Sequence, residues 1–185
     1  ETGAEDLIRQ PVKDHLEYGP FAVEKIRQLT ADQPYLIHLL CRALVDQCNN
    51  QRKVYATIND VNAARREAMQ TCVPHFEWLW ERLSDDEQLL LALIANLGKE
   101  DGRWVSYGEI AERYCYYHFS YERKNLQIWI KALELGDIIE IITDDPAGTA
   151  FLGARVRVPA GLARLWLLKE KPLSLLIDEH QASVS

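Results

Sequence analysis

The run from Leu89 to Ala95 is apolar at every position and follows the polar start Ser84-Asp85-Asp86-Glu87. A serine followed three residues later by a glutamate predicts a capped helix N-terminus, because each side chain bonds a free backbone amide of the other residue. A helix that lacks a polar side must be covered by other elements. The sequence here therefore predicts a helix buried inside a domain.

Two more helices are predicted after the buried one. Gly98 ends that helix, and Trp104-Val105 is long enough only for a very short strand. Ser106-Tyr107-Gly108-Glu109 is another capping box, which predicts a new helix start. A further helix should begin near Ser120 and end at Gly136, because glycine fits the left-handed conformation at a helix end.

Beyond Gly136 the residue pattern changes from one typical of helices to one typical of extended strands. Residues 138–142 are mostly β-branched and too few for a helix, 144–148 are typical of a turn, and 151–158 resume strand character. This pattern predicts a β-hairpin, and Pro159 then begins a last helix. The order helix, short strand, helix, helix, hairpin is that of a winged-helix domain, here spanning 84–170, with 171–185 left as a C-terminal tail.

The first 73 residues predict a bundle of helices. Their expected ranges are about 4–10, 21–30, 35–48 and 58–72. Pro11 ends the first helix, Pro34 suits the first turn of the third, and Thr57-Ile58-Asn59-Asp60 caps the fourth. Pro74 then starts a separate aromatic helix, 74–83, that connects the bundle to the winged helix. The predicted fold class is mainly α, a helical bundle followed by a winged-helix domain with a small hairpin wing.

Composition narrows the classes of function. The formal net charge of -7 disfavours binding that depends on general attraction to phosphates, although it permits a local basic patch. Four cysteines without a Cys-x-x-Cys pair predict reduced, mostly buried thiols. No run of eighteen apolar residues and no signal peptide are present, so we expect a cytoplasmic protein without a membrane partner.

Catalytic and metal-binding patterns are weak. The sequence contains no Gly-x-x-x-x-Gly-Lys-Ser/Thr phosphate loop, and its five histidines stand in no recognised hydrolase context. Three pairs have metal-like spacing, namely His38 with Cys41, Cys72 with His75, and Cys115 with His118. They lie far apart in the chain, and free cysteines are ordinarily packing residues. We therefore expect no catalytic residue and no metal site.

A spaced set of residues between about 4 and 65 points to one family. The set is Ala4, Leu7, Ile8, Pro11, Val12, Tyr18, Ile26, Leu29, Thr30, Gln33, Pro34, Tyr35, Leu36, Ile37, Leu40, Cys41, Ile58, Asp60 and Val61. It resembles the helical lid that follows the nucleotide-binding core in the STAND branch of the AAA+ ATPases and in related archaeal-type ATPases. In that family a Gly-x-Pro element places its proline against the adenine or ribose of bound nucleotide.

The resemblance implies that Gln33, Pro34 and Tyr35 lie at the edge of the nucleotide in the intact protein. Asp32 stands where the family usually has glycine, and aspartate tolerates turn geometry better than most residues. The resemblance also implies that this chain is a regulatory, non-catalytic fragment with no cofactor of its own. The parent protein would bind ATP or ADP with Mg²⁺. The implied partners are an upstream nucleotide-binding domain of the same chain and a protein partner or effector domain.

A DNA-binding transcriptional regulator is the alternative, because many winged helices place their third helix in the major groove. The residues that would contact DNA are Arg123, Gln127 and Lys131 on that helix and Arg155 and Arg157 on the wing strand. Glu122, Glu134 and Asp144-Asp145 lie beside them and would face phosphates without counterions. A third hypothesis is that the chain is a scaffold that contacts no nucleotide.

Overall fold

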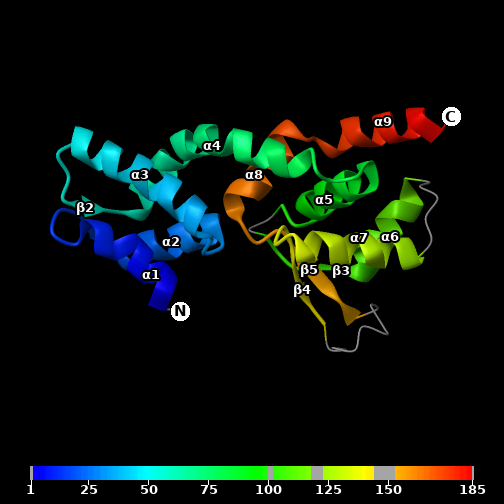
Figure 1. Cartoon of the computed structure of the whole chain (residues 1–185), viewed down its shortest axis with the longest axis horizontal. Helices are drawn as coiled ribbons and strands as arrows, with labels where there is room; N and C mark the ends of the chain where they lie inside the picture. Colours follow the sequence, from blue (N-terminus) through cyan, green and yellow to red (C-terminus); the bar gives the residue numbers. More distant parts are fainter. Residues whose placement is uncertain (1, 100–101, 118–122, 144–152, 185) are drawn as a thin grey trace. The chain divides into compact units, whose positions relative to one another are not determined.

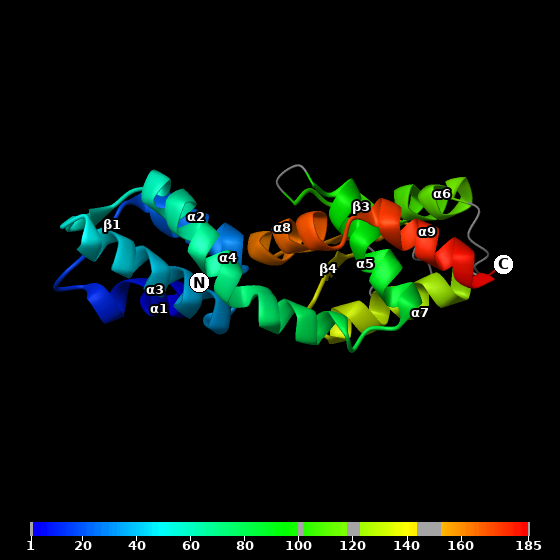
Figure 2. The same cartoon turned by 90° about the horizontal axis from the view of Figure 1, so that it is seen from above.

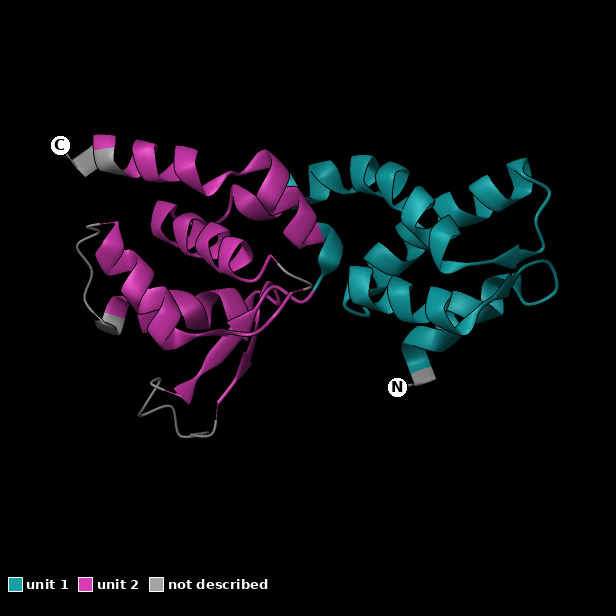
Figure 3. Cartoon of the chain, turned by 180° about the vertical axis from the view of Figure 1, so that it is seen from behind, with its two compact units in different colours: residues 1–77, 160–162 teal, residues 78–159, 163–185 magenta. Residues whose placement is uncertain are grey.

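The computed structural model describes residues 2–99, 102–117, 123–143 and 153–184 of the chain (Figure 1). By its internal contacts the chain divides into two units (Figure 3). Unit 1 comprises residues 1–77 and 160–162, and unit 2 comprises 78–159 and 163–185. The fold is mainly α with a few short strands, which confirms the predicted fold class.

Unit 1 consists of helices joined by one small sheet. The elements in chain order are α1 (Thr2–Arg9), the 3₁₀ turn η1 (Gln10–Val12), β1 (Glu17–Tyr18), α2 (Pro20–Thr30), α3 (Pro34–Asn50), β2 (Tyr55–Ala56) and α4 (Ile58–Trp80), of which residues 78–80 belong to unit 2. The capping box at the start of α4 is confirmed, because the Thr57 amide and hydroxyl both donate to the Asp60 carboxylate, at 2.9 and 2.7 Å. The parallel pair of β1 with β2 was not predicted.

Helix α4 runs through Pro74, so the predicted start of a separate helix at that residue is wrong. Proline inside a helix removes one backbone hydrogen bond and crowds the preceding turn. Here every fourth residue from Ala64 to Trp80 is buried, which keeps one apolar face in register across the proline. Pro74 itself lies on the exposed side. Burial of the long apolar face therefore outweighs the local preference for a break.

Unit 2 has the predicted winged-helix order. Its elements are α5 (Asp85–Leu97), β3 (Val105–Ser106), α6 (Tyr107–Tyr116), α7 (Arg123–Leu135), β4 (Glu140–Ile142), β5 (Arg155–Arg157), α8 (Gly161–Glu170) and α9 (Leu173–Val184). The three strands form an antiparallel sheet in the order β3-β5-β4. The predicted turn at 144–148, the start of the second wing strand and the predicted helix start near Ser120 fall outside the described residues.

Helix α5 is the centre of unit 2. All residues from Leu89 to Ala95 are buried, and both α7 and α9 pack on this helix. The predicted capping boxes are present at α5 and α6, where Ser84 and Ser106 each accept a bond from the amide of the glutamate three residues later. The segment treated as a tail forms α9, which lies against α5 (Figure 2). Within the described ranges, no helix combines the length and the apolar character that a membrane span requires.

Candidate functional site

The turn before α3 has an unusual backbone. Ala31 and Asp32 both have positive φ, 50° and 58°, although neither is a glycine. The Asp32 carboxylate accepts bonds from Nε and Nη2 of Arg27 at 3.0 and 2.8 Å. This ion pair holds Asp32 in the left-handed conformation that glycine adopts more readily.

Gln33, Pro34 and Tyr35 lie at the surface of unit 1. Gln33 is extended and half-buried, its amide donates to the Thr30 carbonyl at 3.1 Å, and its carbonyl accepts from the Ile37 amide at 2.9 Å. Pro34 occupies the first turn of α3 and is exposed. Tyr35 is 48% exposed, and its ring centroid lies 4.7 Å from that of His75. The three residues are therefore accessible to another domain.

A pocket of about 270 Å³ opens beside Pro34. Its lining residues are Leu7, Ile8, Pro11, Val12, Tyr18, Pro34, Ile37, His38, Cys41, Arg42, Val45 and Asp46. They come from α1, η1, β1 and α3, and most of them are apolar. Gln33 and Tyr35 do not line this pocket, so of the three predicted residues the structure brings only Pro34 to it.

The polar groups deep in this pocket are neutral. Tyr18 is only 3% exposed, and burial together with the neighbouring Cys41 thiol raises the pKa of its phenol. Burial likewise raises the pKa of the Cys41 thiol to about 11. Both groups stay protonated at neutral pH, so this part of the pocket suits an uncharged ligand group. The charged side chains of Arg42 and Asp46 are largely exposed.

Sequence reasoning did not assign Leu7, Pro11, Val12 or Tyr18 to a site, although all four belong to the same spaced set of residues as Pro34. Leu7 is exposed, and Pro11 belongs to a short 3₁₀ turn rather than to a helix core. The signal that could have found them was their common membership in that pattern with Pro34. The structure shows that these residues converge on one pocket.

The residues predicted to contact DNA lie in unit 2, and two of them form ion pairs. Lys131 donates to Glu134 at 2.8 Å, and Arg157 pairs with Glu140 at 2.7 Å while its guanidinium lies over the Trp104 ring at 4.5 Å. Arg155 is exposed on the same face of β5 as Arg157. Gln127 is half-buried, and the side chain of Arg123 lies outside the described residues, although its backbone begins α7.

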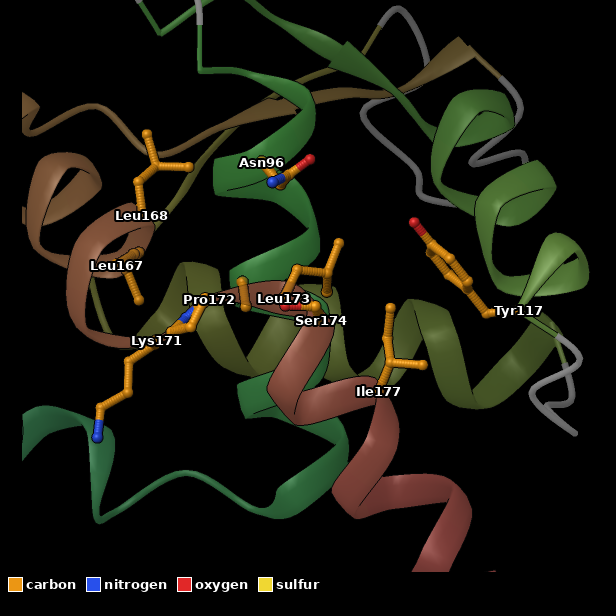
Figure 4. A pocket seen from close by; sticks show the side chains of 10 residues that line it. Asn96, Tyr117, Leu167, Leu168, Lys171, Pro172, Leu173, Ser174 and Ile177 are labelled. Atoms are coloured by element: carbon orange, nitrogen blue, oxygen red, sulfur yellow. The ribbon is translucent and has the colours of Figure 1, made fainter.

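Unit 2 contains a larger pocket of about 370 Å³ beside α9 (Figure 4). Leu167 and Ile177 form apolar walls, and Asn96 and Tyr117 add polar groups. Lys171 also contributes to the rim, and its ammonium lies 5.2 Å from the ring centroid of Trp80 and 5.5 Å from that of Trp166. None of the residues that the sequence pointed to lines this pocket.

The two pairs with metal-like spacing that lie wholly within the described residues, His38 with Cys41 and Cys72 with His75, are not part of a larger cluster of metal-binding side chains. Among the described residues, no group of three or more His, Cys, Asp and Glu side chains is arranged to hold a metal ion. Cys48 and Cys72 are buried, Cys41 is half-buried and Cys115 is exposed. His118 lies outside the described residues.

These features define a class of fold, a helical unit with a surface pocket beside a proline-started helix, combined with a winged helix. No family model matches the sequence, and no curated protein does. Among solved structures, the chain is similar to the Aeropyrum pernix ORC2 protein in its ADPNP-ADP complexes, with a TM-score of 0.60 and 15% identity.

That likeness covers 97% of this chain and 47% of the ORC2 chain, so the present chain spans about half the length of the ORC2 chain. At this level of identity the likeness concerns the fold. It supports the mainly α fold described above and does not single out the STAND branch.

Proposed function

We propose that this chain is the regulatory and interaction part of a STAND-type AAA+ ATPase. In this proposal unit 1 is the lid that closes over a nucleotide, and a nucleotide-binding domain elsewhere in the same protein holds ATP or ADP with Mg²⁺. The winged helix of unit 2 restrains that ATPase or docks on a protein partner. The chain itself is not a catalyst.

The observation that carries the proposal is the placement of Pro34. A lid residue that contacts nucleotide must be exposed while the helix behind it is firmly anchored. Pro34 is exposed at the first turn of α3, and the following residues Leu36 and Ile37 are buried in unit 1. The apolar pocket beside Pro34 gives this surface a recess as well as a contact point.

The size of the pocket supports contact with one part of a nucleotide. Pockets that enclose a drug-sized ligand usually measure roughly 300–1,000 Å³. The volume of about 270 Å³ beside Pro34 falls just below that range. It therefore suits a nucleobase, with the sugar and phosphates left to the other domain.

The surface of α7 supports protein docking by unit 2 more than DNA binding. Ile128 and Leu135 are 54% and 85% exposed and stand seven residues apart, which places them on the same face of the helix. Apolar side chains give little affinity for phosphates, and Lys131 would have to leave Glu134 to reach one. A salt series of mobility shifts with mixed duplex DNA tests the alternative, since tight, salt-sensitive binding would favour it.

The proposed function is tested by comparing the chain alone with the intact parent protein. We expect the chain alone to hydrolyse no ATP and to bind ADP weakly, because the phosphates find no cradle in it. Robust turnover by the purified chain would overturn the proposal. In the intact protein, Pro34→Ala should weaken ADP binding several-fold, whereas the matched exposed change Glu67→Ala on α4 should leave it unchanged.

A further inference from the structure

The pocket beside α9 in unit 2 has no role in the function proposed above. Its volume of about 370 Å³ falls within the range of roughly 300–1,000 Å³ that is usual for small-molecule sites. A cavity of about 150 Å³ already holds benzene, so a single phenyl side chain of a partner would leave much of this pocket empty. The volume therefore suits a small molecule that carries a ring and a substituent.

Pro172 explains why a pocket forms at this point of the chain. Proline has no amide to offer the carbonyl of Leu168 four residues earlier, so α8 ends just before it and α9 begins just after it. The lining comes from both sides of this break, with Leu167 before it and Ile177 after it. Helix α9 packs on α5, which contributes Asn96. The pocket is therefore built by packed helices of one unit.

The lining of this pocket directs no charge into it. Among the described residues, the ten that line the pocket include no aspartate or glutamate, although the chain carries 28 acidic residues. Lys171 lines the pocket, but its ammonium lies 5.2 Å from the ring centroid of Trp80 and 5.5 Å from that of Trp166. Figure 4 shows this ammonium directed away from Asn96 and Tyr117. The stem of Lys171 thus adds apolar wall, and the pocket suits a neutral ligand.

Asn96 is a polar group that can orient a ligand in this pocket. It follows the buried apolar run of α5 and is exposed, and its side chain forms no hydrogen bond with the residues that the structure describes. A carboxamide carries a donor beside an acceptor, so it can pair with another amide through two hydrogen bonds. Figure 4 shows Asn96 on one side of the pocket and Tyr117 on the other, with Leu173 and Ile177 between them. The pocket therefore combines an amide-pairing group with apolar walls.

We propose that this pocket binds a small neutral molecule in which a carboxamide or lactam stands beside an aromatic or branched aliphatic group. The amide of the ligand pairs with the side chain of Asn96, and its apolar group packs on Leu167, Leu173 and Ile177. An anion of the same shape binds more weakly, because its charge would leave water without meeting a cation directed at it. The pocket is distinct from the surface beside Pro34, so its failure as a site would leave the proposed function standing.

The test is a titration of the whole chain with phenylacetamide, followed by NMR shifts of the methyl groups of Leu167, Leu173 and Ile177. Phenylacetate has the same shape with a negative charge and is the matched ligand control. Asn96→Leu keeps the shape of the side chain and removes its hydrogen bonds, and Asn125→Leu makes the same change at an exposed residue of α7 that does not line the pocket. We expect Asn125→Leu to bind phenylacetamide like wild type and Asn96→Leu to bind it at least about fivefold more weakly, which corresponds to one lost hydrogen bond.

Three results would overturn the proposal. The first is that phenylacetamide at millimolar concentration shifts no pocket methyl group of wild type, and the second is that it binds equally well to wild type and Asn96→Leu. The third is that phenylacetate binds wild type as tightly as phenylacetamide does. This last comparison needs no variant, so the proposal can be decided even if a variant is destabilised. The melting temperature of Asn96→Leu should not fall, because the residue is exposed.

Discussion

Replacing Pro74 by alanine should stabilise the protein, because the proline lies in the interior of α4. The helix-interior difference between the two residues is about 3 kcal/mol in isolated helices. Part of this penalty is already relieved here, because Gln70, whose carbonyl loses its bond to residue 74, lies on the exposed side and water can solvate it. We therefore expect a net gain of about 1–2 kcal/mol.

For a chain of this length each kilocalorie raises the melting temperature by about 2–4 °C, so the variant should melt roughly 5 °C higher. Urea denaturation followed by circular dichroism measures the same gain as a free energy. Glu67→Ala, an exposed change on the same helix, should shift the stability by less than about 0.5 kcal/mol. An unchanged or lowered stability of Pro74→Ala would refute the view that burial holds α4 together in spite of the proline.

Three further changes test other parts of the structure. Tyr18→Phe should change the free energy of unfolding by less than about 1 kcal/mol, because the neighbouring Cys41 thiol is a weak hydrogen-bond partner for the buried hydroxyl, and a larger loss of stability in the urea transition would mean that the hydroxyl has a stronger partner. Ala31→Gly should stabilise by about 0.5–1 kcal/mol in the same assay, because glycine adopts the left-handed conformation without strain, and a destabilised variant would contradict this. The Arg103 guanidinium and the Ser106 amide hold the pKa of Glu109 at about 2, below its ordinary 4.5. The stabilisation of the fold by the Glu109 carboxylate is therefore fully present above pH 4.5 and is lost as the pH falls through 2. Glu109→Gln should therefore lower stability at pH 7 by about 1 kcal/mol and flatten the pH dependence of the urea midpoint between these values, whereas an unchanged pH profile would count against the assignment.

The elements with strong local signals were predicted well. Ser84 and Ser106 mark the starts of α5 and α6 through their capping boxes, and such boxes need no knowledge of distant residues. The buried character of α5 was also readable, because its apolar run leaves no polar face. The winged-helix order followed from these elements and from the change of period after Gly136.

The elements that depend on distant contacts could not be predicted in the same way. Strands β1 and β2 have only two residues each, too few to show an alternating pattern, and they form because they meet each other. The prediction at Pro74 rested on the local preference of proline for a helix start. Burial of every fourth residue along α4 instead keeps the helix continuous through Pro74. Helix α9 carries Leu173, Leu176 and Ile177 at helical spacing, but its role becomes visible only where it covers α5.

The candidate site was predicted in part for the same reason. The position of Pro34 at a helix start is a local feature, and the structure places this residue at the surface beside a pocket. The place of Tyr18 in the pocket depends on the parallel pairing of β1 with β2 and on the packing of α1 against α3. No local pattern reports which residues line a pocket together, because that depends on how distant elements pack.

The pairing of β1 with β2 also determines when the pocket can form during folding. Glu17 lies opposite Tyr55, so the chain must close a loop of 55 − 17 = 38 residues before the strand that carries Tyr18 is fixed. Closing such a loop costs entropy that is recovered only when α2 and α3 have docked. On the ribosome, a chain that has not yet exposed Ala56 therefore lacks a finished pocket, which unit 1 can complete only after both strands have emerged.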